Sequence, residues 1–314
     1  EWTASVQQDL GHGLILELAY TASATRKLWK RYDQNMDLLH PGLDSNGGSN
    51  TDNVGVRPFP AFQHGILTTA TAATANFNGG SAKVEKRSKH NGLFFLASYQ
   101  WSKNLDNNSG EVEANDTAYS TDFAFDHSYA RFDVRHRAVI SGGYELPFGK
   151  GHSMLQNGIG NVVAGGWSLQ PAVQLRTGYP FSPSRSGVSF GTYTPGRVNL
   201  APGRTLKSAF KDNPSINSWF DPTAFVDPGG SVQGNVTRNT LRGPGTAQVD
   251  LSAIKTFHIY DRLNAQFRAE AYNIINHGIF SQPAANISST SSVGKISSTS
   301  ADNRSIQLAV KVLF

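Results

Sequence analysis

The chain has 314 residues, of which 16% are charged and 11% are aromatic, and its formal net charge is +5. Because it contains no cysteine, disulfides, thiolate metal sites and cysteine nucleophiles are excluded. The charged fraction lies below the roughly 25% of an ordinary soluble domain, while the aromatic content argues against a disordered chain. No apolar run approaches the roughly 18 residues that a transmembrane helix needs. Composition therefore favours an all-β protein.

The main pattern along the chain is an alternation of apolar and polar residues, which is typical of strands with one apolar and one polar face. It predicts strands near residues 1–9, 13–22, 77–89, 91–103, 134–148, 166–178, 246–259, 262–275 and 303–314. These segments have roughly 9 to 15 residues, whereas strands of globular proteins usually have about 5–6. A tilted strand that crosses a bilayer needs about 9–11 residues, so the lengths favour a membrane barrel.

The alternation also predicts which side chains face lipid and which face the lumen of such a barrel. We expect lipid-facing positions at Leu14, Leu16, Leu18, Phe95, Tyr99, Leu169, Val173 and Phe267. We expect lumen-facing positions at Glu17, Gln100, Gln170, Arg176, Arg268 and Glu270. In the segment FDVRHR, a charged row on one face is expected to line the lumen and to pair with Glu270 or Asp250; its members are Asp133, Arg135 and Arg137. A contact between this row and a plug domain is the alternative.

The connections between the predicted strands alternate strictly between short and long. Short ones fall at 10–12, 90 and 260–261, with a moderate one at 149–165. Long ones, rich in Asn, Ser, Gly, Thr and Pro, fall at 23–76, 104–133, 179–245 and 276–302. Outer-membrane barrels have short periplasmic turns and long extracellular loops, whereas compact soluble domains seldom need four such loops. We therefore expect an antiparallel transmembrane β-barrel with long extracellular loops, in contact with lipid in the bacterial cell outer membrane.

The last predicted strand ends in an apolar row that closes with an aromatic residue. The row consists of Ile306, Leu308, Val310, Val312 and Phe314. A terminal Phe in such a pattern resembles the insertion signal that the barrel-assembly machinery reads. The alternative is a chain that simply ends in a strand.

The number of predicted strands is odd, whereas a closed antiparallel barrel needs an even number. One explanation is an overlooked strand near 62–70 or 224–234. The other, which the abrupt start in a strand favours, is that the chain forms part of a larger barrel and contributes about 9–12 of its strands.

Several stretches resemble TonB-dependent outer-membrane receptors, most closely the Oar-like branch of that family. They are RPFPAF at 57–62, ASYQWSKNLDN at 97–107, FDVRHRAVISGGYELPFGKG at 132–151, GGWSLQPAVQLRTGYPFS at 165–182, LRGPGTAQVDLSAIKTF at 241–257, QFRAEAYNIINHGIF at 266–280 and RSIQLAVKVLF at 304–314. The resemblance implies that residues 1–314 are the C-terminal portion of a receptor barrel, with the N-terminal plug and the earlier strands absent. It also implies that the protein's own plug and the TonB energy complex are its partners.

The resemblance implies a receptor and transporter that takes up an unknown extracellular ligand, rather than an enzyme. Aromatic residues in the long loops are the candidate ligand contacts, namely Trp29, Tyr32, Trp219, Phe220 and Phe225. An adhesion or surface-assembly barrel without transport is the alternative. An energy-coupling segment upstream would distinguish the two.

Motifs for other chemistry are weak. The sequence GVSFG at 187–191 matches G-x-S-x-G. A nucleophile elbow needs a strand before this motif and a helix after it, whereas the flanking sequences here predict loops. An acidic cluster could offer calcium oxygen ligands, although its spacing fits no EF-hand; it comprises Asp106, Glu111, Glu113 and Asp116. The one basic run is better explained as the edge of a strand than as a nucleic-acid site; it comprises Lys83, Lys86, Arg87 and Lys89. We expect no cofactor, no metal and no nucleic-acid partner.

Overall fold

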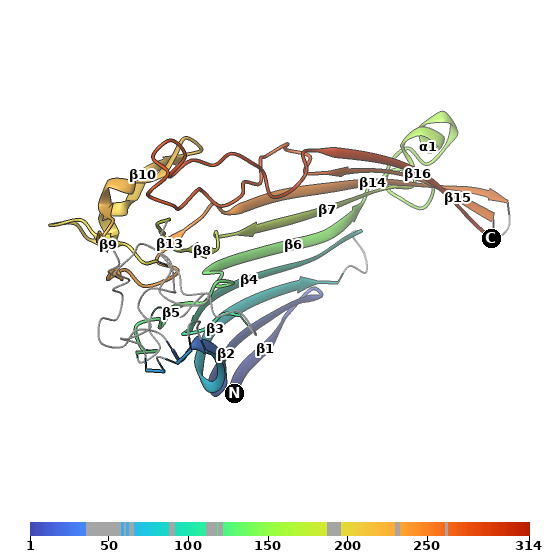
Figure 1. Cartoon of the computed structure of the whole chain (residues 1–314). Coiled ribbons are helices and arrows are strands. Elements are labelled where there is room, and N and C mark those ends of the chain that lie inside the picture. The colour runs from blue at the N-terminus through green and yellow to red at the C-terminus, as the bar shows by residue number, and fades with distance from the viewer. Residues whose placement is uncertain are drawn as a thin grey trace.

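The structure is a computed structural model that describes residues 1–35, 58–59, 61–62, 66–87, 92–110, 118, 122–186, 196–229, 233–260 and 263–314. Its main element is one curved antiparallel sheet, shaped like part of a barrel wall (Figure 1). The strands follow the chain in the order β1 (Trp2–Gly11), β2 (Leu14–Asp33), β3 (Leu67–Lys86), β4 (Leu93–Asp106), β6 (His136–Glu145), β7 (Trp167–Arg176), β14 (Thr246–Tyr260), β15 (Leu263–Tyr272) and β16 (Ser305–Leu313). The short β5 (Ser128–Tyr129) pairs with β4. The predicted all-β, antiparallel architecture is confirmed.

The two strands β2 and β3 are longer than the sequence predicts. Each has 20 residues, so the predicted long connection at 23–76 shrinks to 34–66. The segment 62–70 holds no separate strand among its described residues, because Leu67 already begins β3. In 224–234 the described residues contain only the two-residue β12 (Phe225–Val226). The extensions escaped prediction because that of β3 consists mostly of Thr and Ala, while that of β2 is rich in Lys and Arg and its pairing shifts at β-bulges between Thr25 and Lys30.

The strand register separates the sheet into an apolar face and a polar face. Position by position across four strands, Leu18 lies opposite Ala82, which lies opposite Tyr99, which lies opposite Ala138. Pairs of this kind continue to β16, so the eight positions expected to face lipid share the apolar face. The six expected to face the lumen lie on the other face, where Glu17 pairs with Lys83 and Arg268 with Glu270.

Short turns close the end of the sheet away from the long loops. Between β1 and β2, Gly11, His12 and Gly13 all have positive φ angles. A Cβ atom at Gly13 would lie 2.6 Å from the backbone oxygen of Arg87, so this tight turn requires glycine. The turn lets β2 pair antiparallel with β1, and their register decides which side chains at the start of the sheet lie on the apolar face and which on the polar face.

The connection between β6 and β7 carries the helix α1 (Gly158–Ala164). Ile159 on α1 is 83% exposed, and Val162 and Val163 are exposed as well. The last turn is tied to the apolar face of the sheet because the Nζ atom of Lys255 donates to the carbonyl oxygens of Val163 (2.9 Å) and Gly165 (2.8 Å). The helix therefore turns its apolar side chains away from the protein.

None of the helices in the described residues is long and apolar enough to cross a membrane.

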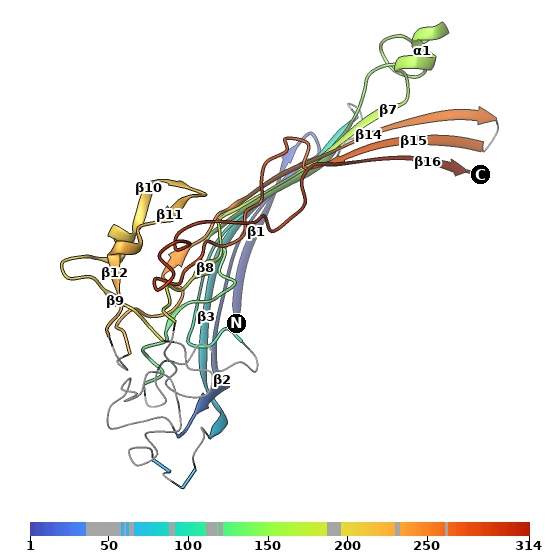
Figure 2. The same cartoon turned by 45° about the horizontal axis from the view of Figure 1, so that its top comes forward.

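The long connection between β7 and β14 folds into a compact assembly at the opposite end of the sheet from α1 (Figure 2). Its short elements are β8 (Pro180–Phe181), β9 (Asn199–Leu200), η3 (Leu206–Ala209), β10 (Phe210–Ser215), β11 (Ser218–Phe220), η4 (Pro222–Ala224), β12 and β13 (Leu241–Arg242). Phe181, Val198, Phe220 and Leu241 are buried together in its core. Part of the connection between β15 and β16 also packs here, through Ala285, Ile287 and Val293. We call this structure the loop assembly.

Candidate functional site

Charged side chains are buried where the loops cover the polar face of the sheet. Arg238 has no exposed side-chain surface and pairs with the carboxylate of Asp106 at the end of β4. Its guanidinium group also donates to the carbonyl oxygens of Asp106 (2.5 Å) and Asp126 (2.8 Å) and to the hydroxyl oxygen of Ser109 (2.9 Å). One arginine of the loop assembly thus holds the connection between β4 and β6 against the sheet.

A second group of buried charges surrounds Asp126. Its carboxylate lies 3.4 Å from Nζ of Lys30 on β2 and 3.4 Å from the guanidinium group of Arg197, and it accepts hydrogen bonds from the backbone N–H of Ala118. Burial raises the pKa of the Asp126 carboxyl, while the charges of Lys30 and Arg197 act in the opposite direction. The Nζ atom of Lys30 also donates to the carbonyl oxygen of Asn107 at 2.7 Å. These contacts join β2, the β4–β6 connection and the loop assembly.

The predicted charged row of FDVRHR has different partners from those expected. Asp133 is buried, accepts a hydrogen bond from the backbone N–H of Asn104 (2.6 Å) and forms an ion pair with Arg242. Arg135 lies over the ring of Tyr129, 5.2 Å from its centroid. The expected pairing of this row with Glu270 or Asp250 does not occur among the described residues, and Asp133, which lies before β6, finds its cation in the loop assembly instead.

The two acids named as partners are engaged elsewhere. Glu270 pairs with Arg268 two residues away at 2.7 Å. Asp250 accepts hydrogen bonds from Gln248 (3.1 Å) and from the backbone N–H of Asn273 (2.8 Å). Arg137 lies beside Gln100 and Arg176 on the polar face.

The five candidate ligand contacts occupy three different environments. Trp29 on β2 is 67% exposed, and Tyr32 on the same strand packs edge-on against Phe123 at 5.0 Å between centroids. Trp219 is partly buried and donates from Nε1 to the carbonyl oxygen of Arg242 (2.8 Å). Phe220 and Phe225 are only 2% and 4% exposed, so their expected role as open aromatic platforms is corrected to a role in the core.

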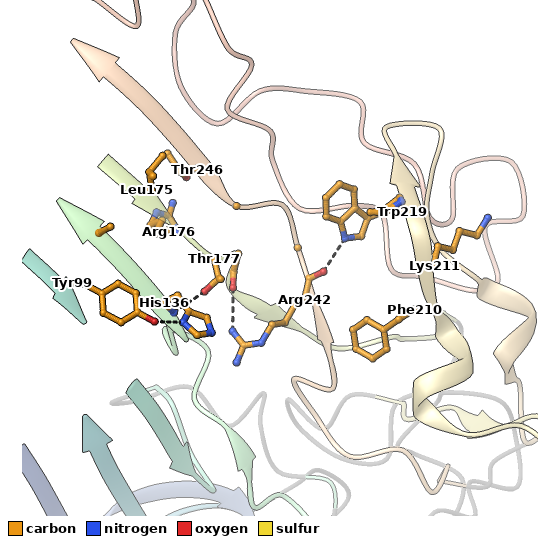
Figure 3. A pocket seen from close by; sticks show the side chains of 15 residues that line it. Tyr99, His136, Leu175, Arg176, Thr177, Phe210, Lys211, Trp219, Arg242 and Thr246 are labelled. Carbon is orange, nitrogen blue, oxygen red and sulfur yellow. Dashed lines mark hydrogen bonds between the residues drawn. The ribbon is translucent and has the colours of Figure 1, made fainter. Parts of the chain in front are cut away.

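A cavity of about 620 Å³ lies on the apolar face of the sheet (Figure 3). The sheet contributes Tyr99, His136, Ala138 and Leu175, and the β10–β11 hairpin contributes Phe210, Lys211, Pro214 and Trp219. The remaining lining comes from the ends of β7 and β14 and from Arg242. We call this space the rim cavity.

Hydrogen bonds fix the sheet side of the rim cavity. The hydroxyl group of Tyr99 is bonded to Nδ1 of His136 at 2.7 Å, and the two rings stack with centroids 6.2 Å apart. The backbone N–H of His136 donates to Oγ1 of Thr177 at 3.2 Å. On the other side, the bond from Trp219 to the carbonyl oxygen of Arg242 joins the hairpin to β13 (Figure 3).

A family model described as "outer membrane beta barrel domain" matches residues 1–307. The chain belongs to this family. It is a protein of the bacterial outer membrane, and its apolar face is the side that lipid covers. No curated protein matches the chain.

One similar solved structure is the crystal structure of the outer membrane transporter YddB from Escherichia coli. The likeness has a TM-score of 0.53 at 9% sequence identity, and it covers 99% of this chain and 32% of the transporter chain. The chain thus spans about a third of that transporter's length. At this identity the likeness shows the fold, which is that of an outer-membrane barrel wall.

Membership of the outer membrane β-barrel family fixes what the two faces do. The polar face, with its buried ion pairs, belongs to the lumen side, whereas the rim cavity opens on the lipid side. The long loops mark the extracellular end by the usual asymmetry of these barrels. The rim cavity therefore lies at the outer edge of the wall rather than on a path through it.

The remaining candidate positions carry little chemistry. Among the described residues no three His, Cys, Asp or Glu side chains gather as a metal site. Asp106 is paired with Arg238, while Glu111, Glu113, Asp116 and the GVSFG sequence lie outside the described residues. The row Ile306, Leu308, Val310, Val312 and Phe314 is strongly exposed on and just after the edge strand β16, and its role as an assembly signal stays a prediction.

Proposed function

We propose that this chain forms part of the wall and the extracellular surface of a TonB-dependent receptor, which binds a ligand over the lumen and imports it. The observation that carries the proposal is the tie between the loops and the strands. Buried pairs from Arg238 to Asp106 and from Lys30 to Asp126 hold loop segments to β4 and β2. Loops held in this way present a preorganised surface, which lowers the entropy cost of binding a ligand.

Two further facts support the proposal. The motifs quoted above resemble TonB-dependent receptors along much of the chain, and the fold is that of an outer membrane transporter's wall. Transport would need a plug in the lumen and an energy complex in the inner membrane, and both are proposed partners. Because the buried ion pairs join the loops to β2 and β4, a ligand that binds to the loops outside the cell would also alter contacts on the polar face of the sheet.

The test is energy-dependent uptake by cells that make the full-length protein. Cells with and without the energy-coupling protein are incubated with a mixture of peptides, glycans and metal chelates, and depletion from the medium is followed by mass spectrometry. We expect at least one compound to be depleted only when both the receptor and the coupling protein are present. Depletion that is independent of the coupling protein would contradict the proposal. If nothing is depleted while the protein still makes cells adhere, the adhesion alternative is favoured.

A further inference from the structure

We propose that a pocket in the loop assembly binds peptides, by taking in one apolar side chain and pairing a positively charged amino group with the carboxylate of Asp227. The pocket has a volume of about 610 Å³ and lies between two long connections, the one from β7 to β14 and the one from β15 to β16. We call it the loop pocket. The inference rests on the proposed function and deepens it, because it names the class of ligand that the extracellular loops bind.

The floor of the loop pocket is apolar and buried. Phe225 of β12 is 4% exposed, and Ile287 and Val293 pack against the core of the loop assembly. Val226 adds an exposed apolar side chain to the lining. The volume lies within the range of about 300–1,000 Å³ that is typical of ligand sites. An aliphatic or aromatic side chain of a ligand would lose apolar contact with water here, which stabilises the complex.

The lining carries one negative charge and contains no basic residue. The charge is that of Asp227, whose side chain is 46% exposed. One carboxylate oxygen, Oδ1, pairs with Arg185 and accepts a hydrogen bond from the backbone N–H of Gly229 at 2.9 Å. The other, Oδ2, accepts no hydrogen bond from the described residues, so it is open to a donor of a ligand.

Hydroxyl groups complete the lining, from Thr223, Ser288 and Thr290. A carboxylate among hydroxyl groups accepts hydrogen bonds from ammonium and amide groups, and it repels an anionic ligand such as a metal chelate with free carboxylates. A sugar would bury hydroxyl groups against the apolar floor without partners, which costs free energy. The lining therefore suits a peptide, which combines an apolar side chain with a charged amino group and amide N–H groups.

Backbone hydrogen bonds hold the two sides of the loop pocket together. The N–H of Ile287 donates to the carbonyl oxygen of Ser184 at 2.8 Å. The N–H of Trp219 donates to the carbonyl oxygen of Gly294 at 2.7 Å. The pocket is therefore shaped before a ligand arrives, which lowers the entropy cost of binding.

The test is affinity selection by the full-length receptor, extracted in mild detergent and followed by mass spectrometry. The probes are a pool of random octapeptides with free amino ends, the same pool acetylated at those ends, and a pool of neutral oligosaccharides. We expect the retained peptides to be enriched in Leu, Ile, Val, Met or Phe at the first position. Acetylation should lower their retention about five-fold, because it removes the charge that pairs with a partly exposed carboxylate.

Two pairs of variants locate the site. Thr290→Trp should reduce retention to background, because an indole at this exposed lining residue fills the loop pocket without removing any charge. Its control is Ser291→Trp, at an exposed neighbour that does not line the pocket. Asp227→Asn should abolish the difference between the free and the acetylated pool, whereas Asp212→Asn on the exposed β10 should preserve it. Heat-modifiable mobility verifies that all four variants are folded.

Equal retention by Thr290→Trp and Ser291→Trp would overturn the assignment to the loop pocket. Equal retention of the free and the acetylated pool would overturn the role of Asp227, and retention of oligosaccharides alone would overturn the choice of a peptide. These measurements need no energy-coupling protein. Peptides that bind but are not taken up by cells would therefore contradict transport and leave the loop pocket standing. Energy-dependent uptake of another compound, with no peptide retained, would overturn the loop pocket alone.

Discussion

Arg238 is the residue on which the loop contacts of the lumen side converge. It is fully buried, and its guanidinium group reaches Asp106, Ser109 and Asp126. We expect Arg238→Met to destabilise the loop assembly by about 3–5 kcal/mol, because it leaves the carboxylate of Asp106 buried without its partner. The measurement is limited proteolysis of the folded protein, in which the loops should be cut much faster while the strands stay protected.

Arg204 supplies the matched control for this variant. It also pairs with an aspartate, Asp221, but both side chains are partly exposed to solvent. A pair of this kind contributes about 0–1 kcal/mol, so Arg204→Met should change the rate of loop cleavage little. Equal acceleration by the two variants would contradict a special role for the buried pair.

At the level of the strand, the two faces of β7 should respond in opposite ways to the same substitution. Val173 lies between Ile140 and Val249 on the apolar face, and its neighbour Gln174 lies between Val139 and Gln248 on the polar face. We expect Val173→Arg to cost about 2–4 kcal/mol, because it places a charge in lipid. Gln174→Arg should be tolerated, since water reaches the lumen side.

The measurement for this pair is the urea midpoint of folding into lipid vesicles, read from heat-modifiable mobility. A larger loss for Gln174→Arg than for Val173→Arg would mean that the faces are assigned the wrong way round.

The strands could be predicted from the sequence because lipid imposes a strict rule on them. Leu14, Leu16 and Leu18 must alternate with residues such as Glu17, so the pattern is visible without any tertiary contact. Above the membrane this rule no longer applies. The sequence of the extended parts of β2 and β3 therefore predicts a loop, although the two strands are paired there. Each of these two segments is a strand because it pairs with the other, and not because of a local sequence pattern.

The candidate site could be predicted far less well, because its contacts join distant parts of the chain. Lys30 and Asp126 are 96 residues apart, and no local pattern indicates that they meet. Phe220 lies in a long polar connection, where an aromatic side chain is expected to be exposed for binding. It is buried instead, because Phe181 and Phe225 pack against it after the loop has folded. The rim cavity likewise forms only when the β10–β11 hairpin lies over the wall.

The whole sheet is open at both edges, which β1 and β16 form. Leaving aside β5, the nine described strands on the path from β1 to β16 alternate in direction, so β1 and β16 run the same way and cannot close as an antiparallel pair. Unpaired backbone groups are costly in lipid, and we therefore expect further strands to cover both edges in the membrane. We expect cysteines at Ser5 and Ala309, one on each edge strand, to form no disulfide in the full-length protein.

The natural absence of cysteine makes this crosslinking experiment unambiguous. Cysteines at Ser5 and Ala19, which lie directly opposite each other on β1 and β2, provide the positive control. Non-reducing gels after mild oxidation give the result. An efficient link between Ser5→Cys and Ala309→Cys would show that the sheet closes on itself, contrary to the odd number of strands.

The hairpin of β2 and β3 extends far beyond the membrane surface on the extracellular side. From Tyr20, at the interfacial level, β2 continues for about 13 residues to Asp33, or about 40 Å along the strand at a rise of about 3.3 Å per residue. A paired ribbon of that length stands well clear of the membrane surface and carries the exposed Trp29 with it. On a cell coated with surface polysaccharide, such a ribbon places an aromatic side chain among the sugar chains, where macromolecules that approach the cell arrive first.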